Sequence, residues 1–172
     1  MPSKKLASRT LAHKLRLIKI IILDVDGVLT DGRITIGSDG TEYKNFDAHD
    51  GYGITRALEL GMKFAAISGR SSTVTDVRMK KLGVKEVYQN QMDKVRICRK
   101  LKSKYRLKDS EICFIGDDEF DLPLLSKVGL SAAPKDAMKS VLKEVDYVAS
   151  KGGGRGAVRE VVDKILRGQR LL

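Results

Sequence analysis

The chain of 172 residues has little of what several protein classes need. Its only cysteines, Cys98 and Cys113, lack the spacing of a metal site, and we expect both to be reduced core residues. Trp is absent and aromatic residues make up 5% of the chain, which leaves few side chains for stacking on single-stranded nucleic acid. No apolar run approaches the roughly 20 residues of a membrane span. We therefore expect a soluble, cytoplasmic protein with no membrane partner.

Positive charge is in excess. The chain has 33 Lys and Arg residues against 22 Asp and Glu, a formal net charge of +11. Such a field attracts anions, either nucleic acid or a small phosphorylated or carboxylated metabolite. Because stacking residues are scarce, we favour the metabolite and expect no nucleic-acid partner. A non-catalytic, basic nucleic-acid-binding module is the less favoured alternative.

The order of apolar segments predicts the fold class. Apolar residues recur at helical spacing within residues 1–17, which are basic and lack acidic residues, and this indicates an amino-terminal basic helix docked on the domain. Beyond it, strands alternate with helices, which predicts a doubly wound (Rossmann-like) α/β domain over residues 1–172, with a parallel sheet and helices on both faces. The strands are expected at 20–23, 63–68, 86–88, 112–116, 130–133 and 146–149, and the helices at 51–60, 71–82, 92–105, 119–128, 136–143 and 157–166.

One insertion interrupts this order. Within residues 32–47, two short segments flank the turn Ser38-Asp39-Gly40, a composition typical of a β-hairpin. The hairpin follows the first strand directly. It is either a flap beside a functional site or a surface decoration.

Two carboxylates follow the first strand. Asp24 and Asp26 lie at its carboxyl end, the edge where parallel sheets bind ligands. If the chain stays extended, alternation places both on the same side. Two like charges held so close need a cation or a shared proton. A solvated turn at the end of a strand would have a similar composition.

Further polar groups follow other predicted strands. They are Ser68-Gly69-Arg70, Lys94 near the start of a helix, and the acidic run Gly116-Asp117-Asp118-Glu119-Phe120-Asp121. Parallel strands end at one edge of the sheet, so these groups can meet Asp24 there. Together they offer oxygen ligands for Mg²⁺, a carboxylate able to attack, a second carboxylate for proton transfer, and Ser and Lys for phosphate charge.

The segment 24–30 with Ser68, Lys94 and 116–118 resembles, in order, the four motifs of the haloacid dehalogenase superfamily of phosphohydrolases. More narrowly, Asp31-Gly32 and the segments 50–54, 67–70 and 153–160 resemble the 3-deoxy-D-manno-octulosonate 8-phosphate phosphatases. The resemblance spans nearly the whole chain. It implies a capless enzyme that hydrolyses this sugar-acid phosphate in lipopolysaccharide sugar biosynthesis; a phosphatase for a related nine-carbon sugar-acid 9-phosphate is the closest alternative.

The resemblance also implies roles for individual residues. Asp24 would be the nucleophile that becomes an aspartyl phosphate, and Asp26 the general acid and then base. Mg²⁺ would be held by the carboxylates of Asp24 and Asp117 and the backbone carbonyl of Asp26. The other implied roles are support of the metal site by Asp118 and Asp121, phosphoryl binding by Ser68 and Lys94, and substrate binding by Thr30, Gly69, Arg70 and Arg155.

The same resemblance implies a homotetramer in which neighbouring subunits cover each other's sites. The hairpin would then take part in assembly of the subunits as well as in closing the site. The tail around Arg155 would recognise substrate, either in its own site or in a neighbour's.

Overall fold

A computed structural model of the chain describes residues 4–172, with side chains from residue 10 onward. Its strands are β1 Ile20–Leu23, β2 Thr35–Ile36, β3 Glu42–Tyr43, β4 Lys63–Ile67, β5 Glu86–Tyr88, β6 Ile112–Ile115, β7 Leu130–Ala133 and β8 Tyr147–Val148. Its α-helices are α1 Lys4–Leu17, α2 Ala48–Glu59, α3 Thr73–Leu82, α4 Lys94–Tyr105, α5 Leu122–Leu125, α6 Lys139–Glu144 and α7 Ala157–Gly168, and two 3₁₀ turns are η1 Asp109–Glu111 and η2 Glu119–Asp121.

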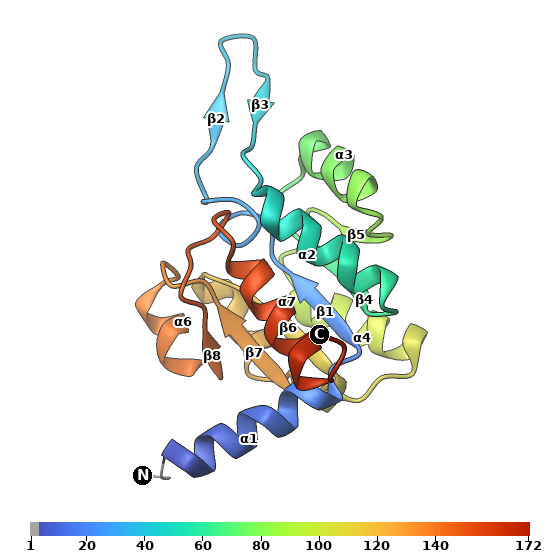
Figure 1. The fold of residues 1–172 in the computed structure, drawn as a ribbon. Helices are drawn as coiled ribbons and strands as arrows, with labels where there is room; N and C mark the ends of the chain where they lie inside the picture. Colours follow the sequence, from blue (N-terminus) through green and yellow to red (C-terminus); the bar gives the residue numbers. More distant parts are fainter. Residues whose placement is uncertain (1–3) are drawn as a thin grey trace.

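Six parallel strands form one sheet in the order β5-β4-β1-β6-β7-β8 (Figure 1). The first strand, β1, lies between β4 and β6, with Leu23 beside Ala66 and Ile115. The predicted α/β class with a parallel sheet is confirmed. Strands β2 and β3 form a separate antiparallel hairpin that projects from the domain (Figure 1).

The central strand is apolar throughout because helices cover both faces of the sheet. Ile21 and Leu23 belong to a core with buried residues of α2, α3 and α7. Ile20 and Ile22 point to the other face and belong to a core with residues of α4, α5 and α6. All four side chains are fully buried, which explains a continuous apolar run in place of an alternating one.

Capping residues define where several helices begin and end. The Asp47 carboxylate accepts from the backbone N–H groups of His49 and Asp50 at the start of α2. Asp93 caps α4 in the same way through Arg96 N–H. Gly83 ends α3 in the left-handed conformation that glycine adopts without strain.

The structure shortens several predicted elements. The helix expected at 119–128 is the turn η2 followed by α5, which ends at Leu125, and the hairpin segments contain only two paired residues each. The basic helix α1 ends on α7, where the Gln169 amide donates to the Ile18 carbonyl over 2.6 Å. Residues 1–3 of the predicted basic helix lie outside the described residues. Within the described chain, no helix has the length and apolarity to cross a membrane.

Candidate active site

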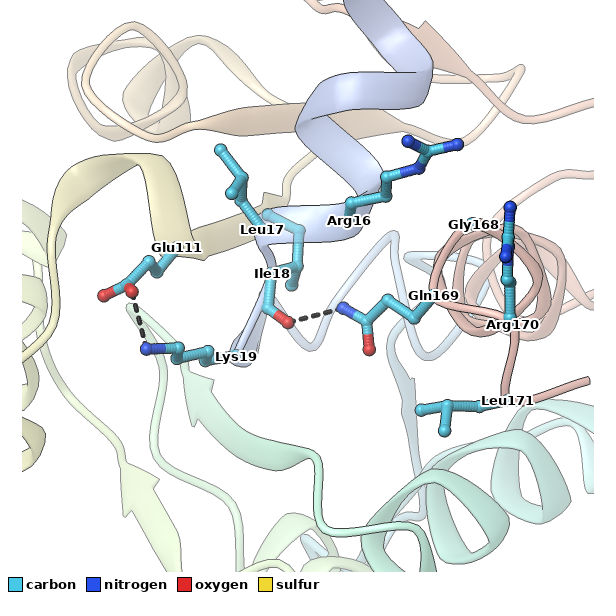
Figure 2. Close-up of a pocket in the computed structure, with 9 residues that line it drawn as sticks. All are labelled: Arg16, Leu17, Ile18, Lys19, Glu111, Gly168, Gln169, Arg170 and Leu171. Atoms are coloured by element: carbon cyan, nitrogen blue, oxygen red, sulfur yellow. Dashed lines mark hydrogen bonds and ion pairs between the residues drawn. The ribbon is translucent and has the colours of Figure 1, made fainter.

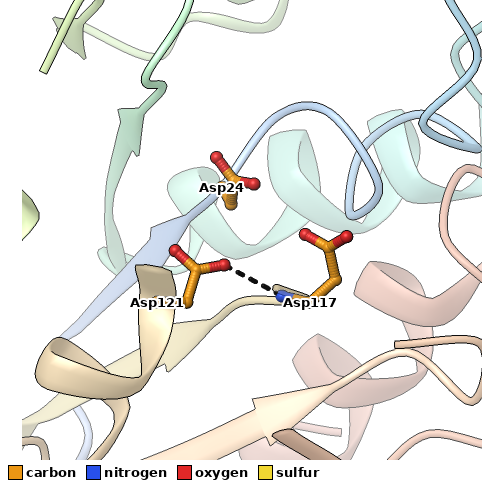
Figure 3. Close-up of side chains that lie close together, drawn as sticks. All are labelled: Asp24, Asp117 and Asp121. Carbon is orange, nitrogen blue, oxygen red and sulfur yellow. Dashed lines mark hydrogen bonds between the residues drawn. The ribbon is translucent and has the colours of Figure 1, made fainter. Parts of the chain in front are cut away.

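Three carboxylates meet at the carboxyl edge of the sheet. Asp24 follows β1, Asp117 follows β6, and Asp121 comes from η2 (Figure 3). One oxygen from each lies within 4.8 Å of the others. Adjacent parallel strands end here together, so residues 93 positions apart along the chain reach one point.

Lys94 lies among these acids. Its ammonium group is 2.8 Å from Asp24 Oδ1 and 2.6 Å from Asp121 Oδ1. Burial lowers the pKa of Lys94, but the attraction of the two carboxylates prevails and the pKa is raised overall. The lysine therefore stays charged at the start of α4, where a cation is unfavourable without an anion beside it.

Even with this lysine, Asp24 and Asp117 hold protons more tightly than usual, because the pKa of each is raised. Burial raises the pKa of Asp24 to about 6, against the opposing attraction of Lys94. Burial also raises the pKa of Asp117 to about 8, and repulsion from Asp24 and Asp121 adds to the effect. A divalent cation would relieve both the repulsion and the loss of hydration.

The donor set fits Mg²⁺. Asp117 Oδ1 is buried and has no hydrogen-bond partner among the described residues, so it is free to bind a cation. Asp121 is fully buried and its two oxygens are in use: Oδ1 contacts Lys94, and Oδ2 accepts from Asp117 N–H at 3.0 Å. Asp121 therefore contacts both Lys94 and the backbone of Asp117, and its expected support of a metal site stays a prediction.

The chain does not stay extended after Asp24. Leu29 N–H and Thr30 N–H both donate to the Val25 carbonyl, so a tight turn begins there. The alternation argument for Asp26 therefore does not apply. Asp26 is placed by the turn, and its Oδ1 lies 2.6 Å from the ammonium group of Lys44 on the hairpin.

A glycine allows this turn to approach the acids. Gly27 has φ +94°, and a Cβ added there would lie 2.0 Å from Asp117 Oδ2. Any side chain at position 27 would displace the candidate metal ligand. The Asp-Val-Asp-Gly order thus has a steric reason as well as a chemical one.

The expected phosphate and substrate residues have different environments. Ser68 is buried at the end of β4, and its hydroxyl accepts from Arg70 N–H at 3.1 Å. Gly69 leaves room beside Met92, whose sulfur would lie 3.2 Å from an added Cβ. Arg70 Nη2 is 3.3 Å from Glu42 Oε2. The structure thus brings Arg70 into contact with the hairpin.

Thr30 is 1% exposed, and its hydroxyl accepts from the backbone N–H groups of Gly27 and Gly32. In this conformation the hydroxyl orders the loop, and the predicted contact of Thr30 with substrate stays a prediction. Asp118 is the N-cap of η2, where its carboxylate accepts from Glu119 N–H. It follows Asp117 directly in the chain.

The glycine-rich segment 152–156 packs on the loop that carries Asp26. Gly154 N–H donates to the Val28 carbonyl at 3.0 Å, and a Cβ at Gly153 would lie 1.8 Å from the Gly27 carbonyl oxygen. Arg155 is exposed, with Nη2 3.6 Å from Asp31 Oδ2. Arg155 therefore contacts the loop after β1 in its own chain, and its role in substrate recognition stays a prediction.

Sequence reasoning missed two residues of this region and the contacts of a third. Glu42 and Lys44 lie two positions apart on the hairpin, a spacing that puts both on one face of an extended segment and could have been noticed. Asp50 accepts from the N–H groups of Gly156 and Arg159 and so fixes the start of α7. Partners 106 and 109 positions away give no local signal in the sequence.

A separate cavity of about 820 Å³ lies at the opposite edge, where α1 and α7 end and β1 begins (Figure 2). Arg16, Lys19 and Arg170 are among its lining residues, and Lys19 pairs with Glu111 at 2.7 Å. None of the predicted site residues lines it.

The fold corresponds to that of known hydrolases. Residues 70–160 match the family model described as haloacid dehalogenase-like hydrolase, and the chain belongs to this family. Within it, the chain is a member of the 3-deoxy-D-manno-octulosonate 8-phosphate phosphatase group. It is 43% identical over 152 residues to the phosphatase KdsC of Escherichia coli strain K12, covering 88% of this chain and 81% of that protein.

Solved structures agree. A hydrolase of the HAD superfamily, subfamily III A, from Legionella pneumophila superposes with a TM-score of 0.95 at 40% identity, covering 96% of this chain and 91% of that one. The 3-deoxy-D-manno-octulosonate 8-phosphate phosphatase of Moraxella catarrhalis, solved with a magnesium ion, a phosphate ion and a KDO molecule, gives a TM-score of 0.91 at 38% identity and covers 93% of this chain and 92% of that one. The resemblance drawn from the motifs is confirmed.

Proposed function

We propose that this protein is a Mg²⁺-dependent phosphatase that hydrolyses 3-deoxy-D-manno-octulosonate 8-phosphate to the free sugar acid and phosphate. The observation that carries the proposal is the buried Asp24 carboxylate, held by Lys94 and grouped with Asp117 and Asp121. The names of the Escherichia coli and Moraxella catarrhalis relatives support the choice of substrate and metal.

The reaction divides between the two carboxylates after β1. Asp24 attacks the phosphorus, the bond from phosphorus to the sugar oxygen breaks, and Asp26 gives a proton to that oxygen. Asp26 then takes a proton from water, which attacks the phosphorus of the aspartyl phosphate and releases phosphate and Asp24. Each cycle therefore consumes one water and restores both side chains.

The surrounding residues stabilise the negative charges of the phosphoryl group and of the substrate carboxylate. Lys94 stabilises negative charge beside Asp24, and Ser68 donates its hydroxyl to a phosphoryl oxygen. Asp24, Asp117 and the Asp26 carbonyl would hold Mg²⁺, whose positive charge lowers the repulsion between the attacking carboxylate and the phosphate. Arg70 and Arg155 offer planar guanidinium groups for the substrate carboxylate.

The proposal includes a cytoplasmic homotetramer. The short hairpin carries exposed apolar side chains at Ile34, Ile36 and Tyr43, which a neighbouring subunit would cover. No large cap domain follows β1 in this chain, so closure of the site would rely on the hairpin and its neighbour.

Phosphate release from a panel of sugar phosphates, with and without Mg²⁺, tests the function. We expect the eight-carbon sugar-acid 8-phosphate to be the best substrate, and Asp24→Asn to lower the rate by at least about a thousandfold because the nucleophile is lost. If a nine-carbon sugar-acid 9-phosphate were turned over faster, it would replace the eight-carbon acid phosphate as the proposed substrate. The absence of Mg²⁺-dependent phosphate release from every sugar phosphate in the panel would refute the phosphatase function.

A further inference from the structure

A chain of alternating charges connects the hairpin to the site. Lys44 Nζ lies 2.6 Å from Asp26 Oδ1 and 3.4 Å from Glu42 Oε1. Glu42 Oε2 in turn lies 3.3 Å from Arg70 Nη2. The hairpin thus supplies the two middle members, and the loops after β1 and β4 supply the ends.

The side chain of Lys44 is buried although the hairpin around it is exposed. Its side chain is 2% exposed, whereas Ile36 and Tyr43 on the paired strands are 63% and 58% exposed. A buried ammonium group requires close carboxylates, and removing either partner leaves an uncompensated charge. Lys44 is therefore a point at which the hairpin is anchored to the site.

The charged chain leaves polar atoms unused. Asp26 Oδ2 and Arg70 Nη1 are buried without a hydrogen-bond partner among the described residues. Buried polar atoms in folded proteins are normally hydrogen-bonded. In Asp26 the free oxygen belongs to the same carboxylate whose other oxygen Lys44 holds, so the lysine fixes the carboxylate without consuming the oxygen needed for proton transfer.

On the basis of the proposed function, we propose that Lys44 is a positioning residue for the phosphatase reaction. From the hairpin it orients the Asp26 carboxylate toward the leaving oxygen of the sugar, and through Glu42 it joins this carboxylate to Arg70. When the hairpin docks on the domain, the Asp26 carboxylate is therefore aligned in the same step. Lys44 itself does not touch substrate.

Single-turnover measurements with enzyme in excess isolate the first step. Proton donation is needed for a sugar alkoxide and hardly at all for p-nitrophenolate, because the phenolate is a good leaving group. We expect Lys44→Met to slow release of the sugar about a hundredfold and release of p-nitrophenolate from p-nitrophenyl phosphate less than about threefold. Binding of the sugar phosphate should change less than about threefold, since Lys44 makes no substrate contact.

Two further variants make the test decisive. Lys44→Arg keeps the charge and should restore sugar release to within about tenfold of wild type. Lys85→Met removes an exposed lysine before β5 and should leave every rate unchanged. Amide hydrogen exchange over residues 33–46 should become faster in Lys44→Met and stay unchanged in Lys85→Met.

Three outcomes would overturn the proposal: equal slowing of the two leaving groups, weaker substrate binding at an unchanged rate, or full activity in Lys44→Met. The first would mean that the variant disturbs the site in general, the second that Lys44 binds substrate, and the third that Asp26 needs no help from the hairpin. Failure of the proposed function would be seen separately, as wild-type protein that does not hydrolyse sugar phosphates.

Discussion

At the scale of single residues, Asp121 shows how one buried carboxylate can organise a site without reacting. It contacts the Lys94 ammonium group with one oxygen and accepts from the backbone N–H groups of Asp117 and Asp118 with the other. The first contact places a cation beside Asp24, and the second holds the backbone at Asp117 and Asp118. Groups that orient metal ligands typically change affinity or activity by roughly 10- to 100-fold when removed.

We therefore predict that Asp121→Asn weakens Mg²⁺ activation. The amide keeps the volume but loses the charge that partners Lys94, so the Mg²⁺ concentration needed for half-maximal activity should rise roughly 10- to 100-fold. Phosphate release titrated with Mg²⁺ measures this. Glu119→Gln, an exposed acid on the same turn, is the matched control, and an unchanged Mg²⁺ requirement in Asp121→Asn would contradict the role.

The raised pKa values of Asp24 and Asp117 lead to a second prediction at this scale. Without Mg²⁺, the folded protein keeps protons that the unfolded chain loses from about pH 4, up to about 6 for Asp24 and about 8 for Asp117. The contribution of these groups to the unfolding free energy therefore falls as pH rises through this window.

Mg²⁺ binds the ionised carboxylates, so its stabilising effect should increase with pH. We expect the difference in Tm with and without Mg²⁺ to increase from pH 6 to pH 8. In Asp117→Asn this increase should be smaller, because the group that titrates highest is gone. A Mg²⁺ effect independent of pH would contradict the electrostatic description of the site.

At the scale of elements, the loop 152–156 is a support for the loop after β1. Asp136 accepts from Gly153 N–H at 2.9 Å, and Asp50 accepts from Gly156 N–H at 3.2 Å. Two carboxylates from distant elements thus hold the glycine-rich segment where its backbone touches residues 27–30. The cluster of glycines permits backbone-to-backbone approach, and no phosphate-binding loop is needed to explain it.

We predict that Gly153→Ala both destabilises the protein and lowers its activity. The added methyl group would overlap the Gly27 carbonyl, so one loop must move, at a cost of about 1–3 kcal/mol typical of overpacking. Urea denaturation and phosphate release measure the two effects. Gly61→Ala is a suitable control, because its site is open and only the left-handed backbone opposes the change, so it should destabilise the protein without lowering the rate of the folded enzyme.

At the scale of the whole molecule, the projecting hairpin has little packing to stabilise it. Its two-residue strands pair with nothing else in the described chain, and its apolar side chains are exposed. A two-stranded hairpin is marginal in water without further packing. Association through this element is the physical reason to expect an oligomer.

We predict that Ile36→Glu reduces the mass of the particle. The isoleucine is 63% exposed in the single chain, and a charge there would oppose burial against a neighbour. Light scattering after size-exclusion chromatography should show four chains for wild type and fewer for the variant, with the single-chain fold retained by circular dichroism. A monomeric wild type would refute the tetramer.

Much of this architecture was predictable from local patterns. Apolar runs bounded by glycine and acid identified all six strands of the sheet, and acidic residues after two strands identified Asp24 and Asp117. The boundaries of short elements were less predictable: the helix expected to reach residue 128 ends at Leu125, because apolar residues alone do not specify where a helix stops. Likewise, the turn at Val25 replaced the extended geometry that would have placed Asp26 by alternation.

The sequence by itself determined the order of strands and helices, the fold class and the chemical types at the sheet edge, because hydrophobic periodicity and turn residues act over a few positions. Only the tertiary structure decided that Asp121 orients Lys94, that Lys44 joins Asp26 to the hairpin, and that Asp50 holds the start of α7. These contacts join residues 18 to 109 positions apart, and such pairing depends on how the layers pack together.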